Sequence, residues 1–84
     1  MLFRLVLLPS ARKELDKLGK RDRVRVDSAF GDLLVHPFSG KQLDGEYKGY
    51  YTIRVWPYRI IYQVRKKELV VVVVRVRHRK DAYK

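Results

Sequence analysis

The sequence contains no cysteine, which excludes disulfides, thiolate chemistry and cysteine-ligated metal sites. Its two histidines, His36 and His78, are far apart and have no carboxylate cluster beside them. We therefore expect no metal site and no cofactor. The apolar run Leu69–Val74 is far too short to span a bilayer, and the N-terminal stretch lacks the small-residue cleavage site of a signal peptide. These absences predict a cytoplasmic protein that does not enter a membrane.

Acidic residues are scarce: nine Asp and Glu stand against 20 Lys and Arg, which gives a net charge of +11. Such an excess attracts polyanions, whether nucleic acid, an acidic protein or an anionic membrane surface. The imbalance is greatest near the C-terminus, because residues 54–84 carry ten basic but only two acidic side chains. A chain of 84 residues has room for one domain, 1–84, and no more.

The first half of the chain predicts a strand followed by two helices. The strand is the apolar run Leu2–Leu8, which stops before a proline. Ser10 is expected to cap a short helix over Ser10–Leu18 that ends at Gly19. A second helix follows and ends ahead of Pro37. Its apolar stripe consists of Val26, Phe30, Leu33 and Leu34.

The second half predicts a loop and three strands. Phe38–Gly49 is polar and rich in glycine, as loops are. The apolar period then changes to two, which indicates strands over 50–56, 58–65 and 69–77. Short connections between them imply hairpins. The predicted fold class is therefore α+β with the order β-α-α-β-β-β, an antiparallel sheet with a two-helix hairpin packed on one face.

The turns between these strands decide which side chains share a face of the sheet. A two-residue connection at Trp56–Pro57 places Arg54 opposite Arg59. A three-residue turn over Lys66–Glu68 then places Arg59 opposite Arg75. In this register the uncovered face, next to Trp56, gathers Arg54, Arg59, Arg75 and Arg77. Like charges in such contact destabilise the sheet, so we expect a bound anion to compensate them.

The same register makes two predictions about the valine-rich last strand. Val70, Val72, Val74 and Val76 should face the core. Ile61, Val71 and Val73 should form an exposed apolar strip beside the arginines, where a protein partner could dock.

Three segments together carry a resemblance to a known family. They are the stretch from Leu43 to Val55, the stretch from Tyr58 to Tyr62, and the stretch from Val76 to Tyr83. With the predicted element order, they resemble the RelE/ParE superfamily of bacterial and archaeal type II toxins over essentially the full length. The RelE-like branch is the better match. The resemblance implies a toxin that cleaves mRNA in the ribosomal A site, using the 2′-hydroxyl of the RNA and no metal. It also implies a cognate acidic antitoxin as partner.

The working residues of RelE-like toxins are basic side chains and a C-terminal tyrosine. By position they correspond to catalytic Arg54, Arg59, Arg79 and Tyr83. We expect Arg59 to hold the scissile phosphate, since a guanidinium grips phosphate with two hydrogen bonds. Further contacts to RNA are expected from Arg75, Arg77, Lys80, Trp56 and His78.

The resemblance is incomplete at one position. Thr52 stands where some RelE-like members carry the first of two basic residues, so the general base is not identified. Two other functions stay open: a ParE-like toxin that inhibits DNA gyrase by binding it, or a catalytically degenerate member that only binds RNA or an antitoxin.

Overall fold

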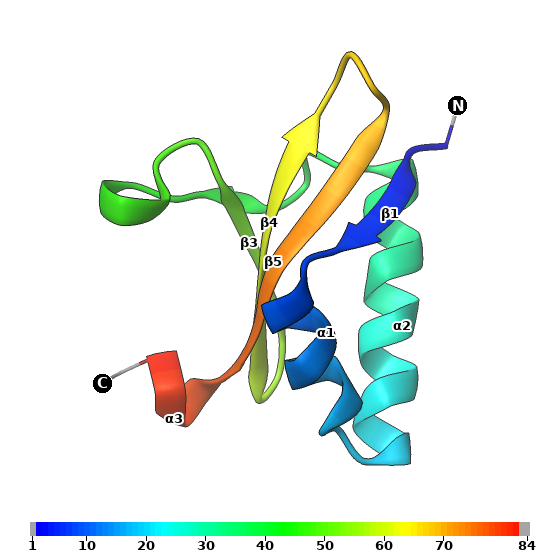
Figure 1. Ribbon diagram of the computed structural model, residues 1–84, viewed down its shortest axis with the longest axis vertical. Helices are drawn as coiled ribbons and strands as arrows, with labels where there is room; N and C mark the ends of the chain where they lie inside the picture. The colour runs from blue at the N-terminus through cyan, green and yellow to red at the C-terminus, as the bar shows by residue number, and fades with distance from the viewer. Residues whose placement is uncertain (1, 83–84) are drawn as a thin grey trace.

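A computed structural model, which describes residues 2–82, shows a five-stranded sheet with two helices packed on one of its faces (Figure 1). The order of strands across the sheet is β1-β5-β4-β3-β2. The strands are β1 (Arg4–Leu7), β2 (Lys41–Gln42), β3 (Tyr51–Val55), β4 (Tyr58–Arg65) and β5 (Val70–His78). The predicted α+β fold, with helices on one face, is confirmed.

The sheet is mixed, because β1 lies parallel to β5 while every other neighbouring pair is antiparallel. The hairpins from β3 to β4 and from β4 to β5 are those that the sequence predicted. The position of β1 was not predicted, since a parallel pair of strands far apart in the chain leaves no turn signal between them. The two-residue strand β2 lies within the stretch predicted as a loop.

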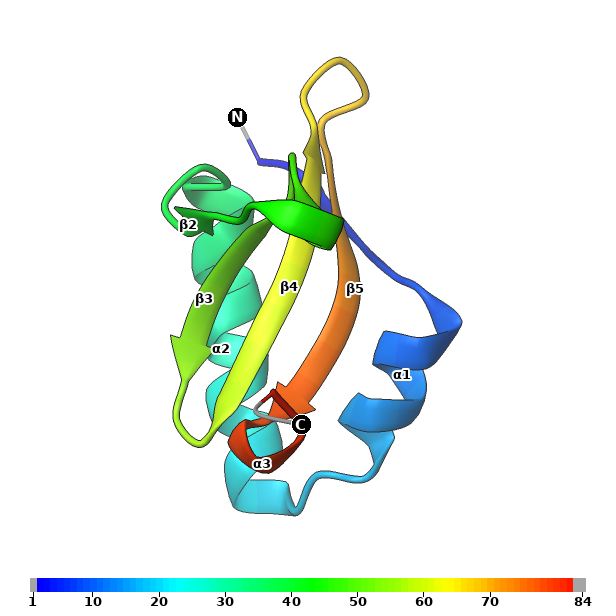
Figure 2. The same ribbon diagram turned by 90° about the vertical axis from the view of Figure 1, so that its left-hand side faces the viewer.

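The helices differ from prediction at their ends. α1 (Pro9–Asp16) begins one residue before Ser10, and its N-cap is Leu8. The predicted Ser10 cap is wrong because proline already has the backbone angle of a first helical residue. Gly19 does not end α1 but is the N-cap of α2 (Lys20–Val35). On the opposite side of the sheet lie the short helices η1 (Gly45–Tyr47) and α3 (Arg79–Ala82) (Figures 1 and 2).

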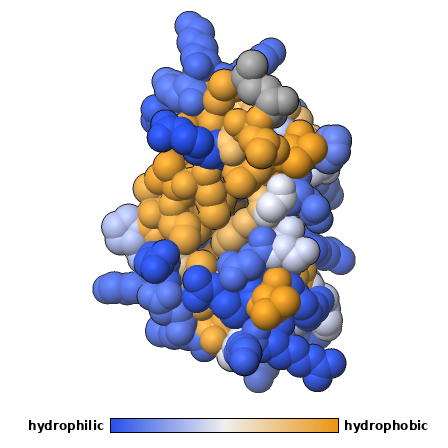
Figure 3. Space-filling view, turned by 90° about the vertical axis from the view of Figure 1, so that its right-hand side faces the viewer, coloured by the Kyte–Doolittle hydropathy of each residue, from blue (hydrophilic) through white to orange (hydrophobic). Residues whose placement is uncertain are grey.

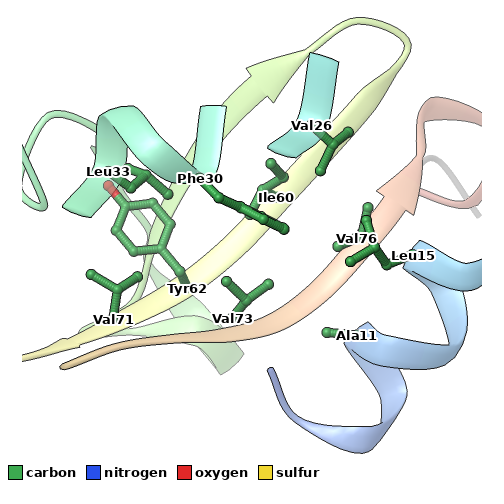
Figure 4. Packing of buried hydrophobic residues seen from close by; sticks show 10 residues of the cluster. All are labelled: Ala11, Leu15, Val26, Phe30, Leu33, Ile60, Tyr62, Val71, Val73 and Val76. Carbon is green, nitrogen blue, oxygen red and sulfur yellow. The ribbon is translucent and has the colours of Figure 1, made fainter. Parts of the chain in front are cut away.

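The core fills the space between the sheet and the two long helices (Figure 4). Each fully buried Val, Leu or Ile side chain stabilises the fold by roughly 1.5–3 kcal/mol. The buried cluster contains Ala11, Leu15, Val26, Phe30, Leu33, Ile60, Tyr62, Val71, Val73 and Val76.

The register between β4 and β5 corrects the prediction. The turn has four residues rather than three, so that Arg65 is opposite Val70. A bulge then shifts the pairing at Ile61 and Tyr62, and it leaves Val74 without a partner in β4. Beyond the bulge Arg59 is opposite Arg77, not Arg75.

The bulge also changes which valines of β5 reach the core. Val71 and Val73 face the helices before it, and Val76 does so after it. The predicted apolar strip beside the arginines is therefore wrong, since Ile61, Val71 and Val73 are all buried. Large apolar side chains are exposed elsewhere, and Figure 3 shows apolar atoms gathered over the side that carries β1 and α2. The exposed large apolar residues in or next to these two elements are Leu2, Val6, Leu8, Val24, Val35 and Phe38.

The helices of residues 2–82 do not combine the length and apolar character needed to cross a membrane. In the same part of the chain, no three His, Asp or Glu side chains gather in the way that a metal ion requires.

Candidate functional site

Three arginines lie side by side across the centre of the sheet. Arg54 of β3 is opposite Arg59 of β4, as predicted, and Arg59 is opposite Arg77 of β5. The preceding row, which contains Ile53, Ile60 and Val76, faces the helices and packs in or against the core. Because neighbouring residues of a strand point to opposite faces, the three arginines lie on the face away from α1 and α2. We call them the arginine row.

The strands that carry the arginine row contribute no negative charge. The strands β3, β4 and β5 contain no aspartate and no glutamate. Neither Arg54 nor Arg59 forms an ion pair with any residue that the structure describes. Arg54 and Arg59, which lie opposite each other without a carboxylate to pair with, repel one another, so a bound anion such as phosphate would stabilise this face.

Arg75 is less able to bind an anion than Arg54 or Arg59, because its guanidinium forms an ion pair with Glu14 of α1. Its Nη2 lies 2.7 Å from Oε2 of Glu14, and its Nε lies 3.1 Å from Oε1. Both side chains are largely buried, with exposed fractions of 31% and 22%. This paired geometry neutralises the charge of Arg75, and we leave it out of the RNA site.

Arg79, the first residue of α3, is held at the β3–β4 turn. Its amide donates a 2.8 Å hydrogen bond to the carbonyl of Pro57, and its guanidinium lies 5.0 Å from the centre of the Trp56 ring. On the other side of the turn, Nη1 of Arg25 donates a 2.6 Å hydrogen bond to the carbonyl of Trp56. The turn therefore joins α2 to α3 and fixes the direction in which Arg79 leaves the sheet.

The remaining predicted residues do not all lie with the arginine row. His78 is opposite Tyr58, in the row that faces the helices, and their rings meet edge to face at 5.4 Å. Its Nδ1 accepts the amide hydrogen of Lys80 at 3.1 Å. His78 also lines a small cavity of about 220 Å³ with Glu14 of α1 and with Lys17, which follows α1. It thus faces away from Arg54 and Arg59, whereas the exposed Lys80 belongs to α3. Tyr83 lies outside the described residues.

A pocket of about 520 Å³ opens beside the arginine row. Arg54, Arg59 and the small side chain of Thr52 line it from the sheet, and the loop before and after β2 lines it from the other side. Lys41 is the cation that this loop contributes, and sequence reasoning assigned it no role. Ligand pockets in proteins have volumes of this order.

A family comparison identifies the chain. The model of the ParE toxin of the type II toxin–antitoxin system parDE matches residues 5–83. This chain belongs to the RelE/ParE superfamily of type II toxins. The toxin is 39% identical to Toxin RelG of Mycobacterium tuberculosis over 77 residues, which are 89% of this chain and 88% of that one.

Solved structures agree with this membership. The toxin resembles a chain of the toxin–antitoxin complex RelBE2 from M. tuberculosis, with 34% identity and a TM-score of 0.85 over 93% of this chain and 99% of that one. It also resembles a variant of E. coli toxin RelE in the free state, with 29% identity and a TM-score of 0.80 over 99% of this chain and 90% of that one. The RelE-like resemblance drawn from three sequence segments is confirmed.

Sequence reasoning found the arginines of the toxin but missed its pocket. The alternation around Trp56–Pro57 was enough to pair Arg54 with Arg59. The polar sequence around Lys41 does not indicate that these residues add a strand to the edge of the sheet. Lys41 was therefore indistinguishable from any other surface lysine. The one available signal was Gly40, a glycine at a point where the loop approaches the sheet closely.

Proposed function

We propose that this toxin is an endoribonuclease that cuts ribosome-bound mRNA on the face of its sheet that carries the arginine row. The observation that carries the proposal is the alignment of Arg54, Arg59 and Arg77 across three neighbouring strands that contain no carboxylate. Its similarity to toxins named RelE and RelG supports it further.

The reaction is a transfer within the RNA itself. The 2′-oxygen of a ribose attacks the adjacent phosphorus, the bond from phosphorus to the 5′-oxygen breaks, and the products carry a 2′,3′-cyclic phosphate and a 5′-hydroxyl. Negative charge grows on the phosphoryl oxygens, and preorganised cations lower the barrier by stabilising it. A base must accept the 2′-hydroxyl proton and an acid must protonate the leaving oxygen.

We assign these tasks to side chains of the uncovered face. Arg59, in the middle of the row, is assigned to the scissile phosphate, and Arg54 and Arg77 to oxygens on either side of it. Arg79 approaches from α3 and is assigned to the leaving group. Trp56 and Lys80 are RNA-contacting candidates near Arg79. Tyr83 stays a predicted proton carrier or stacking group.

The toxin is further proposed to have an acidic antitoxin as its partner in the cytoplasm. The similar M. tuberculosis structure is a toxin–antitoxin complex, and so is the solved E. coli RelBE complex, to which this chain is 29% identical. A net charge of +11 favours an acidic binding segment.

The test is primer extension on mRNA from translating ribosomes. We expect the wild type to produce cuts within codons, and Arg59→Ala and Arg79→Ala each to slow them by about 100-fold, the usual effect of removing one charge-stabilising donor. Arg65→Ala removes the same charge from an exposed position at the end of β4 and should cut at the wild-type rate.

The family model names a ParE toxin, and this observation supports gyrase inhibition as a second candidate. A toxin that leaves mRNA intact but traps gyrase on DNA would establish that function and refute the nuclease. A toxin that binds RNA or antitoxin and does neither would be a degenerate member.

A further inference from the structure

The pocket beside the arginine row is formed by two segments that are not neighbours in the chain. One wall is Ser39, Gly40, Lys41 and Leu43, and the other is Thr52, Ile53, Arg54 and Arg59. No carboxylate lines it, and three of its eight lining residues are cations. Its volume of about 520 Å³ is in the range of pockets that hold nucleotide-sized ligands.

The register of β2 directs Lys41 toward this pocket. Lys41 is directly opposite Thr52 in the antiparallel pair, so both side chains lie on the face of the sheet that carries Arg54. Thr52 has a small side chain, and it lines the pocket together with Lys41 and Arg54. Arg54 is the diagonal neighbour of Lys41, and long side chains reach one another at that separation.

A tight contact fixes the loop that carries Lys41. The amide of Gly40 donates a 3.0 Å hydrogen bond to the hydroxyl of Tyr62, whose ring is in the core. A Cβ atom at Gly40 would lie 2.4 Å from that hydroxyl and 2.8 Å from the carbonyl oxygen of Thr52. The residue before Lys41 is therefore pressed against the sheet, and Lys41 is held more firmly than a lysine of a free loop.

Lys41 is also uncompensated. Its side chain is exposed, and it forms no ion pair with the residues that the structure describes. Asp16, Asp22 and Asp27 pair with arginines of α1 and α2, and Glu14 pairs with Arg75. An ammonium group beside two guanidinium groups in an open pocket suits a strand of phosphates.

We propose that Lys41 binds a backbone phosphate of the RNA next to the one held by Arg59, and that the pocket between them holds the intervening nucleotide. This inference rests on the proposed nuclease function, and it adds a substrate-binding residue from the edge strand β2. Lys41 lengthens the site beyond the arginine row, so that the toxin grips two successive phosphates.

The test measures binding and cleavage separately. Binding to a single-stranded RNA hexamer with 2′-O-methyl groups, which cannot be cut, is followed by fluorescence anisotropy at several salt concentrations. We expect Lys41→Ala to raise Kd about tenfold, the effect of one charge-assisted hydrogen bond. It should also lower the slope of log K against log salt by about 0.7, the value for one phosphate of a single strand. Lys41→Arg should stay within about threefold of the wild type.

Lys67→Ala is the matched control, because it removes the same charge from the exposed β4–β5 turn. If Lys41→Ala and Lys67→Ala bind the hexamer equally well, Lys41 is not a phosphate ligand, whether or not the wild type cleaves mRNA. If the wild type binds the hexamer through Lys41 but does not cut ribosome-bound mRNA, the nuclease proposal fails and the Lys41 contact stands.

Discussion

The contact between Gly40 and Tyr62 is the tightest constraint on a single residue of the site. A methyl group at Gly40 would overlap the Tyr62 hydroxyl and the Thr52 carbonyl, so either β2 or the core side chain must move. We expect Gly40→Ala to lower the free energy of unfolding by about 2 kcal/mol, as overpacking does. Urea denaturation measures this change.

Gly31 provides the matched control for that substitution. It lies exposed inside α2, and no atom is within 4 Å of a Cβ built there. Gly31→Ala should raise the free energy of unfolding by about 0.8 kcal/mol, because alanine is the better helix former. If Gly40→Ala were as stable as the wild type, or gained stability as Gly31→Ala does, the tight approach of Gly40 to the sheet would be contradicted.

Two tyrosines, the buried Tyr62 and the partly buried Tyr58, make stability depend on alkaline pH. Burial raises the pKa of Tyr62 above its ordinary value of 10.0, and burial with the 3.1 Å hydrogen bond to Asp22 raises the pKa of Tyr58. Above pH 10 the unfolded tyrosines lose their protons before the folded ones do. The folded state then binds more protons, so stability falls as pH rises from about 10 through the folded pKa.

Substitution of either tyrosine by phenylalanine removes one of these two titrating hydroxyl groups. We expect Tyr58→Phe and Tyr62→Phe each to show a smaller loss of stability between about pH 9 and pH 11 than the wild type. Urea midpoints across this range measure the loss. An unchanged slope in both variants would mean that neither hydroxyl is shielded from water in the folded toxin.

Among the structural elements, α1 has an unusual position, because it replaces a strand at the edge of β5. The strand β1 pairs with β5 only as far as Val73. Beyond that point Ser10 Oγ donates a 3.0 Å hydrogen bond to the carbonyl of Val74, and Oε1 of Glu14 accepts the amide hydrogen of Val76 at 2.8 Å. Ser10 and Glu14, which are one helical turn apart, thus form hydrogen bonds with backbone groups of Val74 and Val76 that would otherwise be unpaired at the edge of β5.

Glu14 should therefore matter for stability more than a surface glutamate does. Glu14→Ala leaves both Arg75 and the amide of Val76 without this acceptor, and we expect a loss of about 2 kcal/mol. Glu14→Gln keeps an oxygen for Val76 and should lose less. Thermal unfolding of both variants tests this order, and equal stability of Glu14→Ala and the wild type would show that α1 does not close this edge.

The β3–β4 turn is expected to act on cleavage through Arg79. Trp56→Ala removes the ring beneath the guanidinium and should slow mRNA cleavage about fivefold, the effect of losing about 1 kcal/mol of cation–π contact. Trp56→Phe should recover most of the rate, which a general loss of folding would not allow. Phe38→Ala, which removes another exposed aromatic ring, should cleave like the wild type. A full rate for Trp56→Ala would exclude this positioning role.

The elements differ in how far the sequence could define them. The β3–β4 hairpin was predictable because its turn contains a proline and because apolar and polar residues alternate in both strands next to that turn. The β4–β5 hairpin was predictable too, but its register was not, because a run of valines fits any register. Neither the four-residue turn nor the bulge at Val74 leaves a pattern among identical side chains. Arg77 therefore took the place predicted for Arg75, which instead reaches Glu14, 61 positions away in the chain.

At the scale of the whole molecule, the carboxylates are distributed unevenly between the helices and the central strands. The carboxylates Asp16, Asp22 and Asp27 lie on α1 and α2, where they pair with arginines of the same two helices. The strands β3, β4 and β5 have none. Net charge alone predicted a polyanionic partner, but only the topology tells which face would receive it. The proposed cutting face is the one that α1 and α2 leave uncovered.

We propose above all that RNA bound to this face is cut by its own 2′-hydroxyl, while the arginine row stabilises the negative charge that grows on the phosphate. The most direct measurement uses ribosomes carrying a synthetic mRNA whose A-site codon contains 2′-deoxyribose at the cleaved position, compared with the same mRNA containing ribose. We predict cleavage of the ribose mRNA, with a 2′,3′-cyclic phosphate on the upstream fragment, and no cleavage of the deoxyribose mRNA. Equal cleavage of both would contradict it.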